Sequence, residues 1–372
     1  MDIPRVLALV QLPPPVHGAA LRNSDFVNSD VINSRCDLRY ISIQTASSIS
    51  DVGKYGLFKY FKFLYKFLLL FKELVFFRPQ VVYVTLSAKG LGFLKDFIFI
   101  FIALIFRRKV VCHMRNRGLD NTLYESKLKF IYVYFLSKCS YICMSKTLCE
   151  DVKLVSKCPF VIANCLTLDA FDLSQELLSR RRDELTIIYL SNISEDKGSL
   201  LFLEFVDEFK KLSPAVYDSV KFKVFGPFSN EIEKQKFFHK LHSLKEINVD
   251  VMGAIYGESK LEMLSSASML VFPTSYDKEC YPGVIMEAFC FGIPVISSKI
   301  AAIPEMIEQG VNGFVLENNP RLYAEKAIEI INGKLDLFSV AAQNTYKNKM
   351  FYKMIHNQIV DSFEECINEN KT

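Results

Sequence analysis

The sequence is short of the features that identify metal, redox and nucleotide-hydrolysing proteins. It has no tryptophan, and no Asp-x-Asp, Cys-x-x-Cys or Gly-x-x-x-x-Gly-Lys pattern occurs in its 372 residues. These absences argue against a carboxylate site for Mg²⁺ or Mn²⁺, against a zinc or dithiol site, and against a P-loop. We therefore predict no metal and no cofactor, and interpret the ten cysteines as reduced thiols of a cytoplasmic protein.

No apolar run is long enough to cross a bilayer, which takes about 18–20 residues. The nearest candidate has ten apolar residues, 97–106, followed by Arg107-Arg108-Lys109, and we predict that it forms a buried helix. The first residues, MDIPRVLALVQLPPP, combine an acid at position 2 with a strand-like run and prolines, unlike a secretory signal. We expect a cytoplasmic location, with at most peripheral attachment to the inner face of the cytoplasmic membrane.

The charges that are present divide unevenly between the two halves of the chain. Residues 1–180 contain 24 Lys and Arg against 14 Asp and Glu, a net +10, whereas residues 181–372 contain 21 against 27, a net −6. A basic first half suggests an anionic partner: a membrane surface, a phosphate-bearing acceptor or nucleic acid. Nucleic acid is disfavoured because the basic residues alternate with long Phe and Leu runs and no stacking motif is visible.

Twelve short apolar runs alternate with helical patterns and are candidate strands. They are residues 5–12, 38–43, 81–86, 109–114, 141–145, 160–164, 185–191, 221–226, 249–253, 269–274, 294–298 and 313–318. Continuously apolar strands that alternate with helices are typical of parallel sheets covered on both faces. The pattern predicts an α/β protein of two Rossmann-like domains, 1–180 and 181–345, whose sheets face each other across a cleft. A helical tail, 346–372, is expected to pack on one of them, and ligands are expected at the carboxyl ends of the strands.

Two further interpretations concern helices and histidines. The segment 56–79 places Lys59, Lys62 and Lys66 on one face among Phe, Tyr and Leu. It is either a core helix with a solvated lysine face or an aromatic, basic surface for anionic lipid, and the net +10 slightly favours lipid. The histidines in polar helical stretches, namely His239, His242 and His356, are expected at the surface.

The stretch ECYPGVIMEAFCFGIPVISS, residues 279–298, carries the strongest chemical signal. Pro282-Gly283 should begin a helix, and the free N–H groups of a helix start bind anions. Glu287 would lie one turn into that helix, and a carboxylate can accept two hydroxyl hydrogen bonds, as a ribose diol requires. One short segment can therefore hold a phosphate through its backbone and a sugar through its carboxylates, Glu279 and Glu287.

This stretch resembles the E-x7-E motif of the retaining glycosyltransferases of family 4, which have the GT-B fold and use nucleotide sugars. Further segments resemble the family's pattern in the expected order: PPPVHGAALRN (13–23), VVCHMRNRG (110–118), MSKTLCEDV (144–152), VIANCL (161–166), SNISEDKG (191–198), VFGPF (224–228), the stretch 252–279 and IPEMIEQGVNGFVLE (303–317). The resemblance spans nearly the whole chain and is more specific in the second half than in the first.

The resemblance implies that 1–180 is the acceptor domain and that 181–345 is the nucleotide-sugar donor domain. It also implies a donor site and a catalytic set, the latter formed by His113, Glu279 and Lys197. The donor site would comprise Gly18, Asn192, Lys197, Gly226, Glu279, Gly283, Val284, Ile285 and Glu287. Lys197 would neutralise the donor diphosphate, Glu279 would bind the transferred sugar, and His113 would lie near the anomeric carbon. His17 is left out of this set.

Plainer interpretations of the same residues stay open. Lys197 could be an ordinary first-turn lysine, Glu279 a solvated loop acid and His113 a buried histidine at a strand end. Arg115 and Arg117 could contact an anionic acceptor or only cap the strand end. The family often has Gly-Arg where this chain has Ser191-Asn192, so the second phosphate cation is missing, and its Asn-Gly is Asn164-Cys165 here.

The resulting prediction is a retaining, metal-independent hexosyltransferase. It would move a sugar from a nucleotide diphosphate donor, UDP favoured over GDP, to a glycan or lipid-linked acceptor in surface polysaccharide biosynthesis such as that of lipopolysaccharide. Its partners would be the nucleotide sugar, the acceptor and anionic membrane, and not nucleic acid. The alternatives are a non-catalytic glycosyltransferase-like scaffold and a nucleotide-sugar epimerase of the same fold.

Overall fold

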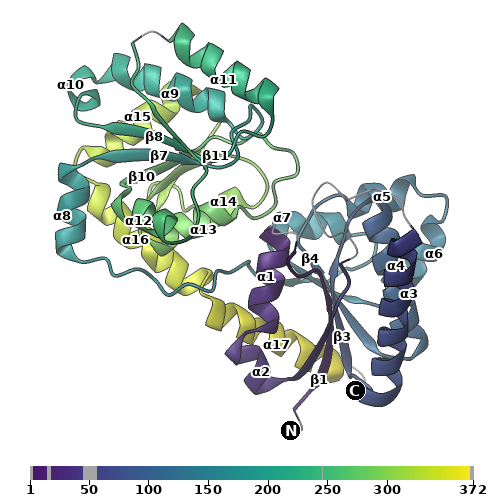
Figure 1. Cartoon of the computed structure of the whole chain (residues 1–372). Helices are drawn as coiled ribbons and strands as arrows, with labels where there is room; N and C mark the ends of the chain where they lie inside the picture. The colour runs from purple at the N-terminus through teal and green to yellow at the C-terminus, as the bar shows by residue number, and fades with distance from the viewer. Residues whose placement is uncertain (1–2, 15–17, 45–56, 245, 369–372) are drawn as a thin grey trace. The chain divides into compact units, whose positions relative to one another are not determined.

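Two separate six-stranded parallel sheets form the framework of the chain (Figure 1). The computed structural model describes residues 3–14, 18–44, 57–244 and 246–368, and for 57–63 the backbone alone. The chain divides into two compact units, residues 1–167 with 352–372, and residues 168–351. All twelve candidate strands are present, so the α/β class with two parallel sheets is confirmed.

The sheet of the first unit has the strand order β2-β1-β3-β4-β5-β6. Its strands are β1 (Arg5–Val10), β2 (Asp37–Ser42), β3 (Val81–Leu86), β4 (Lys109–Met114), β5 (Ser140–Cys143) and β6 (Phe160–Val161). Every residue of β3 is buried, which explains its uninterrupted apolar run, VVYVTL. The chain passes from β1 outward to β2 and then returns to the opposite side of β1 with β3, so the topology reverses between β1 and β3.

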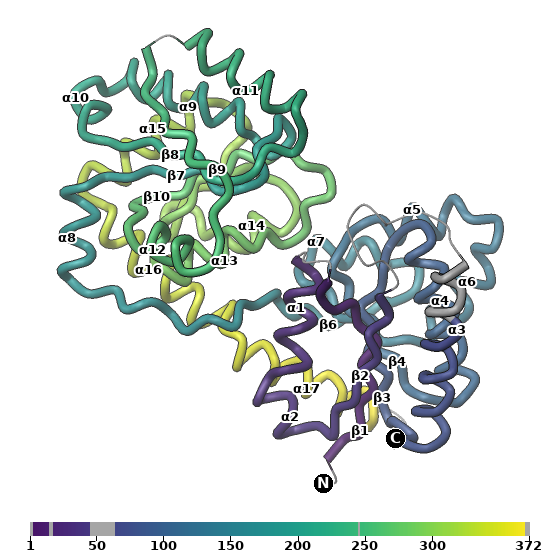
Figure 2. The backbone as a smooth tube through the Cα atoms, in the orientation of Figure 1, coloured from purple at the N-terminus to yellow at the C-terminus, as the bar shows by residue number. Residues whose placement is uncertain are grey.

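Helices cover both faces of this sheet (Figures 1 and 2). One face packs against α1 (Gly18–Val27), α2 (Asp30–Arg35) and α17 (Tyr352–Asn368). The other carries α3 (Leu57–Lys72), η2 (Glu73–Phe77), α4 (Gly90–Ile105), α5 (Leu119–Glu125) and α6 (Lys129–Leu136), and α7 (Lys146–Cys149) and η3 (Glu150–Val152) follow β5. The apolar run 97–106 forms most of α4, with Phe99 and Ile100 buried and Ile105 exposed. No helix among the described residues is long and apolar enough to span a membrane.

The C-terminal helix α17 belongs to the first unit although it ends the chain. Arg35 of α2 pairs with Asp361 at 2.9 Å and with Glu364 at 2.8 Å. The expectation that His356 lies at the surface is wrong, since it is only 2% exposed. Its Nδ1 lies 2.7 Å from Ser29 Oγ, and its ring packs against Phe26 in the apolar layer that joins α17 to the sheet.

The sheet of the second unit has the order β12-β11-β10-β7-β8-β9. Its strands are β7 (Thr186–Leu190), β8 (Lys221–Phe225), β9 (Asp250–Gly253), β10 (Met269–Phe272), β11 (Val295–Ser298) and β12 (Gly313–Leu316). The helices are α8 (Gln175–Asp183), α9 (Ser199–Leu212), α10 (Pro214–Tyr217), α11 (Glu231–Ser243), α12 (Gly257–Ser266), α13 (Gly283–Cys290), α14 (Ile303–Met306), α15 (Pro320–Ile331) and α16 (Leu335–Lys349). This is the strand order of a dinucleotide-binding fold, with its reversal between β7 and β10.

The lysine face expected on the segment 56–79 lies partly outside the described side chains. Among the residues of α3 that are described, Lys66 is half-buried and Lys72 is exposed. Tyr65 and Leu68 are also exposed, at 58% and 57% of their surface. The segment is therefore not a fully buried core helix.

Candidate functional site

Three loops of the second unit meet where its sheet reverses direction. They follow β7, β8 and β10 and comprise residues 191–198, 226–230 and 273–282. Ligands of open parallel sheets bind at this position because the loops on either side of the reversal diverge and leave a crevice. The predicted residues Asn192, Lys197, Gly226 and Glu279 all lie in these loops.

Hydrogen bonds to Tyr189 and to Ser275 fix the loop after β7. The hydroxyl of buried Tyr189 lies 3.1 Å from Asn192 O and 3.2 Å from Lys197 O. Burial raises the pKa of Tyr189, so this phenol stays protonated and can donate. Asp196 O accepts Ser275 N–H at 2.8 Å, which joins the loop to the segment after β10.

Two glycines allow these loops to approach each other. A Cβ on Gly198 (φ +83°) would lie 2.0 Å from Pro273 O, and one on Gly226 (φ +138°) would lie 1.8 Å from Ser191 O. Both residues have the positive φ that glycine alone adopts without strain. Gly226 therefore has a structural role, since it lets the loop after β8 lie against the loop after β7.

Lys197 forms an ion pair with the first motif glutamate. Its Nζ lies 2.6 Å from Glu279 Oε2 and 3.9 Å from the centre of the Tyr276 ring. The two side chains are 18% and 12% exposed, so the pair lies mostly out of solvent but can be reached by a ligand. A cation and a carboxylate are thus held together at the point where β7 and β10 diverge.

The second motif glutamate lies in α13 and pairs with a lysine that the sequence reasoning missed. Lys260 of α12 lies 2.8 Å from the Glu287 carboxylate, and the two side chains are 25% and 23% exposed. No side chain caps the start of α13, where Gly283 is exposed. Gly283 and Val284 line the same cavity as Glu287. Lys260 occurs in the segment 252–279, but its spacing from Glu287 gave no sign that the two would meet.

These groups line one cavity of about 340 Å³. Seven of the predicted donor-site residues line it: Asn192, Lys197, Gly226, Glu279, Gly283, Val284 and Glu287. Ile285 does not, because it is fully buried and its N–H donates to Pro282 O at 3.2 Å. The structure adds Ile255, Tyr256 and Lys260 to the wall of the cavity.

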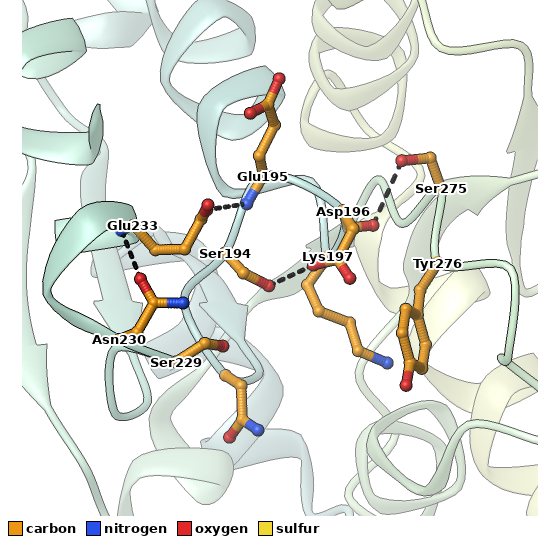
Figure 3. Close-up of a pocket in the computed structure, with 10 residues that line it drawn as sticks. Ser194, Glu195, Asp196, Lys197, Ser229, Asn230, Glu233, Ser275 and Tyr276 are labelled. Atoms are coloured by element: carbon orange, nitrogen blue, oxygen red, sulfur yellow. Dashed lines mark hydrogen bonds between the residues drawn. The ribbon is translucent and has the colours of Figure 1, made fainter. Parts of the chain in front are cut away.

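A second, larger pocket of about 710 Å³ adjoins the first and shares Asn192 and Lys197 with it (Figure 3). The other residues that line it have hydroxyl, carboxyl or amide side chains. Glu233 accepts the backbone N–H of Glu195 at 2.6 Å, and Lys236 binds Glu195 on the outer side. Carboxylates and hydroxyls of this kind hydrogen-bond sugar hydroxyl groups.

The two remaining predicted residues, Gly18 and His113, belong to the first unit. Gly18 begins α1 and is exposed, with no atom within 4 Å of a Cβ built on it. His113 is 1% exposed at the end of β4, and its Nδ1 lies 2.7 Å from Tyr83 OH. Burial lowers the pKa of His113 well below its ordinary value, and the nearby Arg115 and His356 lower it further. His113 is therefore neutral at pH 7, and its role toward a donor sugar stays a prediction.

Clusters of metal-ligating side chains are absent from the part of the chain that the structure describes. No group of three or more His, Cys, Asp or Glu side chains there could hold a metal ion. The cations that face the two cavities are side-chain ammonium groups, those of Lys197 and Lys260.

The unit that contains these cavities is similar in sequence to known proteins. Residues 172–348, nearly all of the second unit, match the family model described as glycosyl transferases group 1. One similar protein is the lipopolysaccharide 1,2-N-acetylglucosaminetransferase of Salmonella typhimurium, which is 26% identical over 267 residues, covering 69% of this chain and 66% of that protein. Spore coat protein SA of Bacillus subtilis is 24% identical over 150 residues, and an uncharacterized glycosyltransferase of Methanocaldococcus jannaschii is 25% identical over 228 residues. The alignments span 66%, 39% and 56% of these three curated relatives, less than two thirds of each.

Solved structures are similar in fold along the whole chain. A glycosyltransferase from Rickettsia africae is 14% identical with a TM-score of 0.74, over 99% of this chain and 100% of that one. Anabaena HepE in complex with UDP and glucose is 15% identical with a TM-score of 0.66, over 98% of this chain and 100% of that one. At these identities the likeness shows the fold alone, which is that of GT-B glycosyltransferases.

Proposed function

We propose that this protein is a retaining glycosyltransferase that moves a hexosyl unit from a nucleotide diphosphate sugar to a glycan or lipid-linked glycan of a surface polysaccharide. One observation carries the proposal. Lys197, Glu279, the uncapped start of α13 and Glu287 line a single cavity at the reversal point of a dinucleotide-type sheet. The match of residues 172–348 to glycosyl transferases group 1 supports it.

The cavity offers a separate partner for each part of a nucleotide sugar. The N–H groups of Gly283 and Val284 and the ammonium of Lys197 would hold the diphosphate. The Glu287 carboxylate would accept the ribose hydroxyls, and Ile255 and Tyr256 would border the base. UDP is the nucleotide we favour, because HepE, which shares the fold, holds UDP with glucose.

Binding of the donor would separate Lys197 from Glu279, and each side chain would then contact a different part of the donor. Lys197 would turn to the diphosphate, and Glu279 would then be free to accept hydroxyl hydrogen bonds from the transferred sugar. Asn192 stands where the family often has an arginine and brings no charge, so Lys197 and α13 would carry the stabilisation of the leaving group. In this proposal no metal ion takes part.

The reaction that fits this arrangement is attack of the acceptor from the same side as the leaving group. The bond between the anomeric carbon and the phosphate oxygen breaks, and its electron pair leaves with the nucleoside diphosphate. The acceptor hydroxyl oxygen bonds to the anomeric carbon, and its proton passes to the leaving phosphate oxygen. Configuration at that carbon is retained, without a carboxylate nucleophile.

A thermal-shift screen of UDP, GDP, ADP and their common sugars tests the donor site. A nucleotide at 100 times its Kd should stabilise the folded chain by about 2.7 kcal/mol. Glu287→Ala should abolish the ligand-induced shift. Glu262→Ala, on the exposed side of α12 and outside the cavity, should keep it. If no nucleotide stabilises the wild-type chain, the proposal fails and a non-catalytic scaffold is the better account; turnover of the free nucleotide sugar without an acceptor would instead indicate an epimerase.

We also propose that the side of the first unit that carries α5 and α6 rests on an anionic membrane. Phe130 and Tyr134 of α6 are 86% and 60% exposed, and Tyr124 at the end of α5 is 74% exposed. Lysines stand over two of these rings, Lys129 over Tyr124 and Lys138 over Tyr134. Aromatic side chains with lysines around them suit the interface of a bilayer with anionic head groups.

Flotation with phosphatidylglycerol-containing vesicles tests this surface. The wild-type chain should float with them, should not float with pure phosphatidylcholine, and should dissociate as salt is raised. Phe130→Ser should weaken binding several-fold. Leu337→Ser in the second unit, at a residue 72% exposed, is the matched control and should bind as the wild type does. Equal binding of the two variants would contradict the proposal.

A further inference from the structure

Three arginines lie together at the amino-terminal edge of the first unit's sheet. Arg5 begins β1, Arg78 lies between η2 and β3, and Arg108 lies between α4 and β4. These three strands are neighbours in the sheet, and backbone hydrogen bonds join their starts. The N–H of Gln80 donates to Arg5 O at 2.8 Å, and that of Lys109 donates to Gln80 O at 3.3 Å. Because neighbouring strands are only about 4.8 Å apart, the three arginine side chains emerge close to one another.

Carbonyl groups of η2 and of the residue after it hold these guanidinium groups. Arg5 Nε donates to Arg78 O at 3.2 Å, and Arg78 Nε donates to Val75 O at 3.1 Å. Arg108 Nη2 donates to Leu74 O at 3.2 Å, while Arg108 Nε is buried and has no hydrogen-bond partner among the described residues. A guanidinium group has five N–H donors, so most of the donors at this edge are left for water or for a ligand.

Carboxylates do not balance the positive charge of this cluster. Burial lowers the pKa of Arg108, and the charges of Arg78 and Arg5 lower it further, so the three groups are close enough to repel one another. Glu73, the acidic residue of η2, pairs instead with Arg39 at 3.0 Å. Within the described part of the chain, none of the three arginines has an ion-pair partner.

Stabilisation of helix ends explains only part of this charge. Both η2 and α4 end at this edge, and the end of a helix carries about half a negative charge. Two helix ends thus offset about one of the three positive charges, and about two remain. Arg78 also has a left-handed backbone, with φ +51°, directly after a helix, where glycine or asparagine fits without strain. The chain therefore has an arginine where ending the helix needs no charged side chain.

We propose that Arg5, Arg78 and Arg108 form a binding site for a phosphomonoester, separate from the proposed donor cavity of the second unit. A phosphomonoester carries about −1.5 to −2 charges at pH 7 and three acceptor oxygens, which matches the charge left at this edge. Arginine suits such a ligand because its planar group donates two parallel hydrogen bonds to phosphate oxygens. Arg5 and Arg78 are exposed, so the ligand reaches them from solvent. Rotation of the half-buried Arg108 toward the phosphate would give Nε the acceptor that it lacks.

Exposed apolar side chains next to the arginines in the sequence separate two sources of the phosphate. Phe76, two residues before Arg78, is 79% exposed, and Ile105, three residues before Arg108, is 59% exposed. A lipid phosphomonoester would bring acyl chains that cover them, whereas a small phosphorylated compound would leave them in water. Replacement of Phe76 should therefore weaken binding of the lipid and not of the small compound.

A titration of the ¹⁵N-labelled full-length chain with inorganic phosphate, followed through the arginine Nε–H resonances, tests the small ligand. Phosphate should shift the resonance of Arg108 Nε–H, which is identified by its absence from Arg108→Gln, and sodium chloride at equal ionic strength should not. Arg78→Gln should raise the Kd read from that resonance about 10-fold, because it removes charge-assisted hydrogen bonds. Arg321→Gln, which removes an exposed arginine of the second unit, is the matched control and should leave the Kd unchanged.

Flotation with phosphatidylcholine vesicles that contain phosphatidic acid, a lipid phosphomonoester, tests the other source. If lipid supplies the phosphate, these vesicles bind the wild-type chain, and Arg78→Gln and Phe76→Ser each weaken that binding several-fold. If a small compound supplies it, the three proteins float equally and only the resonance titration depends on Arg78. The dependence on Arg78 should persist in Phe130→Ser, which alters the separate surface on α6.

Two results would overturn the inference. One is that neither the titration nor the flotation depends on Arg78, and the other is that phosphate shifts Arg321 Nε–H as much as Arg108 Nε–H. Folding of each variant is checked by circular dichroism and by the UDP-induced thermal shift, which these substitutions should leave unchanged. Because the arginines belong to the first unit and the proposed donor cavity to the second, lack of any UDP effect would count against the transferase function and not against the phosphate site.

Discussion

Replacing Gly198 by alanine tests whether the close approach of two loops holds the proposed donor site together. Gly198 precedes α9 with φ +83°, and it directly follows Lys197. A Cβ at this position would lie 2.0 Å from Pro273 O and 2.5 Å from Pro273 C, both backbone atoms of the segment after β10. The substitution therefore cannot be absorbed by a flexible side chain, and one of the two loops must move.

The magnitude follows from two separate costs. Placing a non-glycine residue in the left-handed region costs about 1–2 kcal/mol. Forcing a well-packed contact apart costs about 1–3 kcal/mol more. Gly198→Ala should thus lower the free energy of unfolding by about 2–5 kcal/mol. Gly257→Ala is a matched control, because Gly257 also has positive φ (+58°) at a helix start but no atom within 4 Å of its Cβ, so about 1–2 kcal/mol is expected.

Urea unfolding of the two variants, with hydrogen exchange of β7 and β10 to assign the transition of the second unit, measures the difference. For a unit of this size each kcal/mol corresponds to a Tm change of about 2–4 °C. Gly198→Ala should also weaken the UDP-induced shift, since movement of the loop displaces Lys197 from Glu279. An effect of Gly198→Ala no larger than that of Gly257→Ala would refute the reasoning, because the backbone contact would then contribute nothing.

Two further predictions concern buried charge and pH. Arg181 is 1% exposed and donates to the carbonyl groups of Leu264, Ser265 and Gly292. Arg181→Met should therefore lower the free energy of unfolding, measured in urea, by about 3 kcal/mol or more. Arg182→Met is the control, because Arg182 forms an exposed ion pair, and it should cost less than about 1 kcal/mol. Burial lowers the pKa of His356 to about 4 from an unfolded value of 6.5. The unfolded chain therefore takes up a proton that the folded chain does not, and the stability present above pH 6.5 should fall by up to about 3 kcal/mol as pH drops to 4. His356→Gln should flatten that part of a stability–pH profile, and an unchanged slope would contradict the burial of a neutral imidazole.

The sequence alone determined the strands and the two-glutamate motif of this protein. Buried parallel strands must be apolar along their whole length, so runs such as VVYVTL and MLVF are visible without any tertiary information. The two-glutamate motif could be recognised for a similar reason. Glu279, the Pro282-Gly283 turn and Glu287 lie within nine residues, and local rules for helix starts place them relative to one another.

Tertiary structure alone decided which distant side chains meet. Nothing local connects Lys260 with Glu287 or Lys197 with Glu279, because sheet topology brings α12 and the loop after β7 to the start of α13. The same applies to His356, whose polar neighbours in sequence suggested the surface, while its own side of α17 turns to Phe26 and Ser29. Arg22 and Arg115 are 93 positions apart in the sequence. Both reach residues 164–165 only because α1 and the end of β4 lie near each other at the carboxyl ends of the strands of the first sheet. Local pattern therefore fixed what each segment is, and the order of the strands fixed which segments share a site.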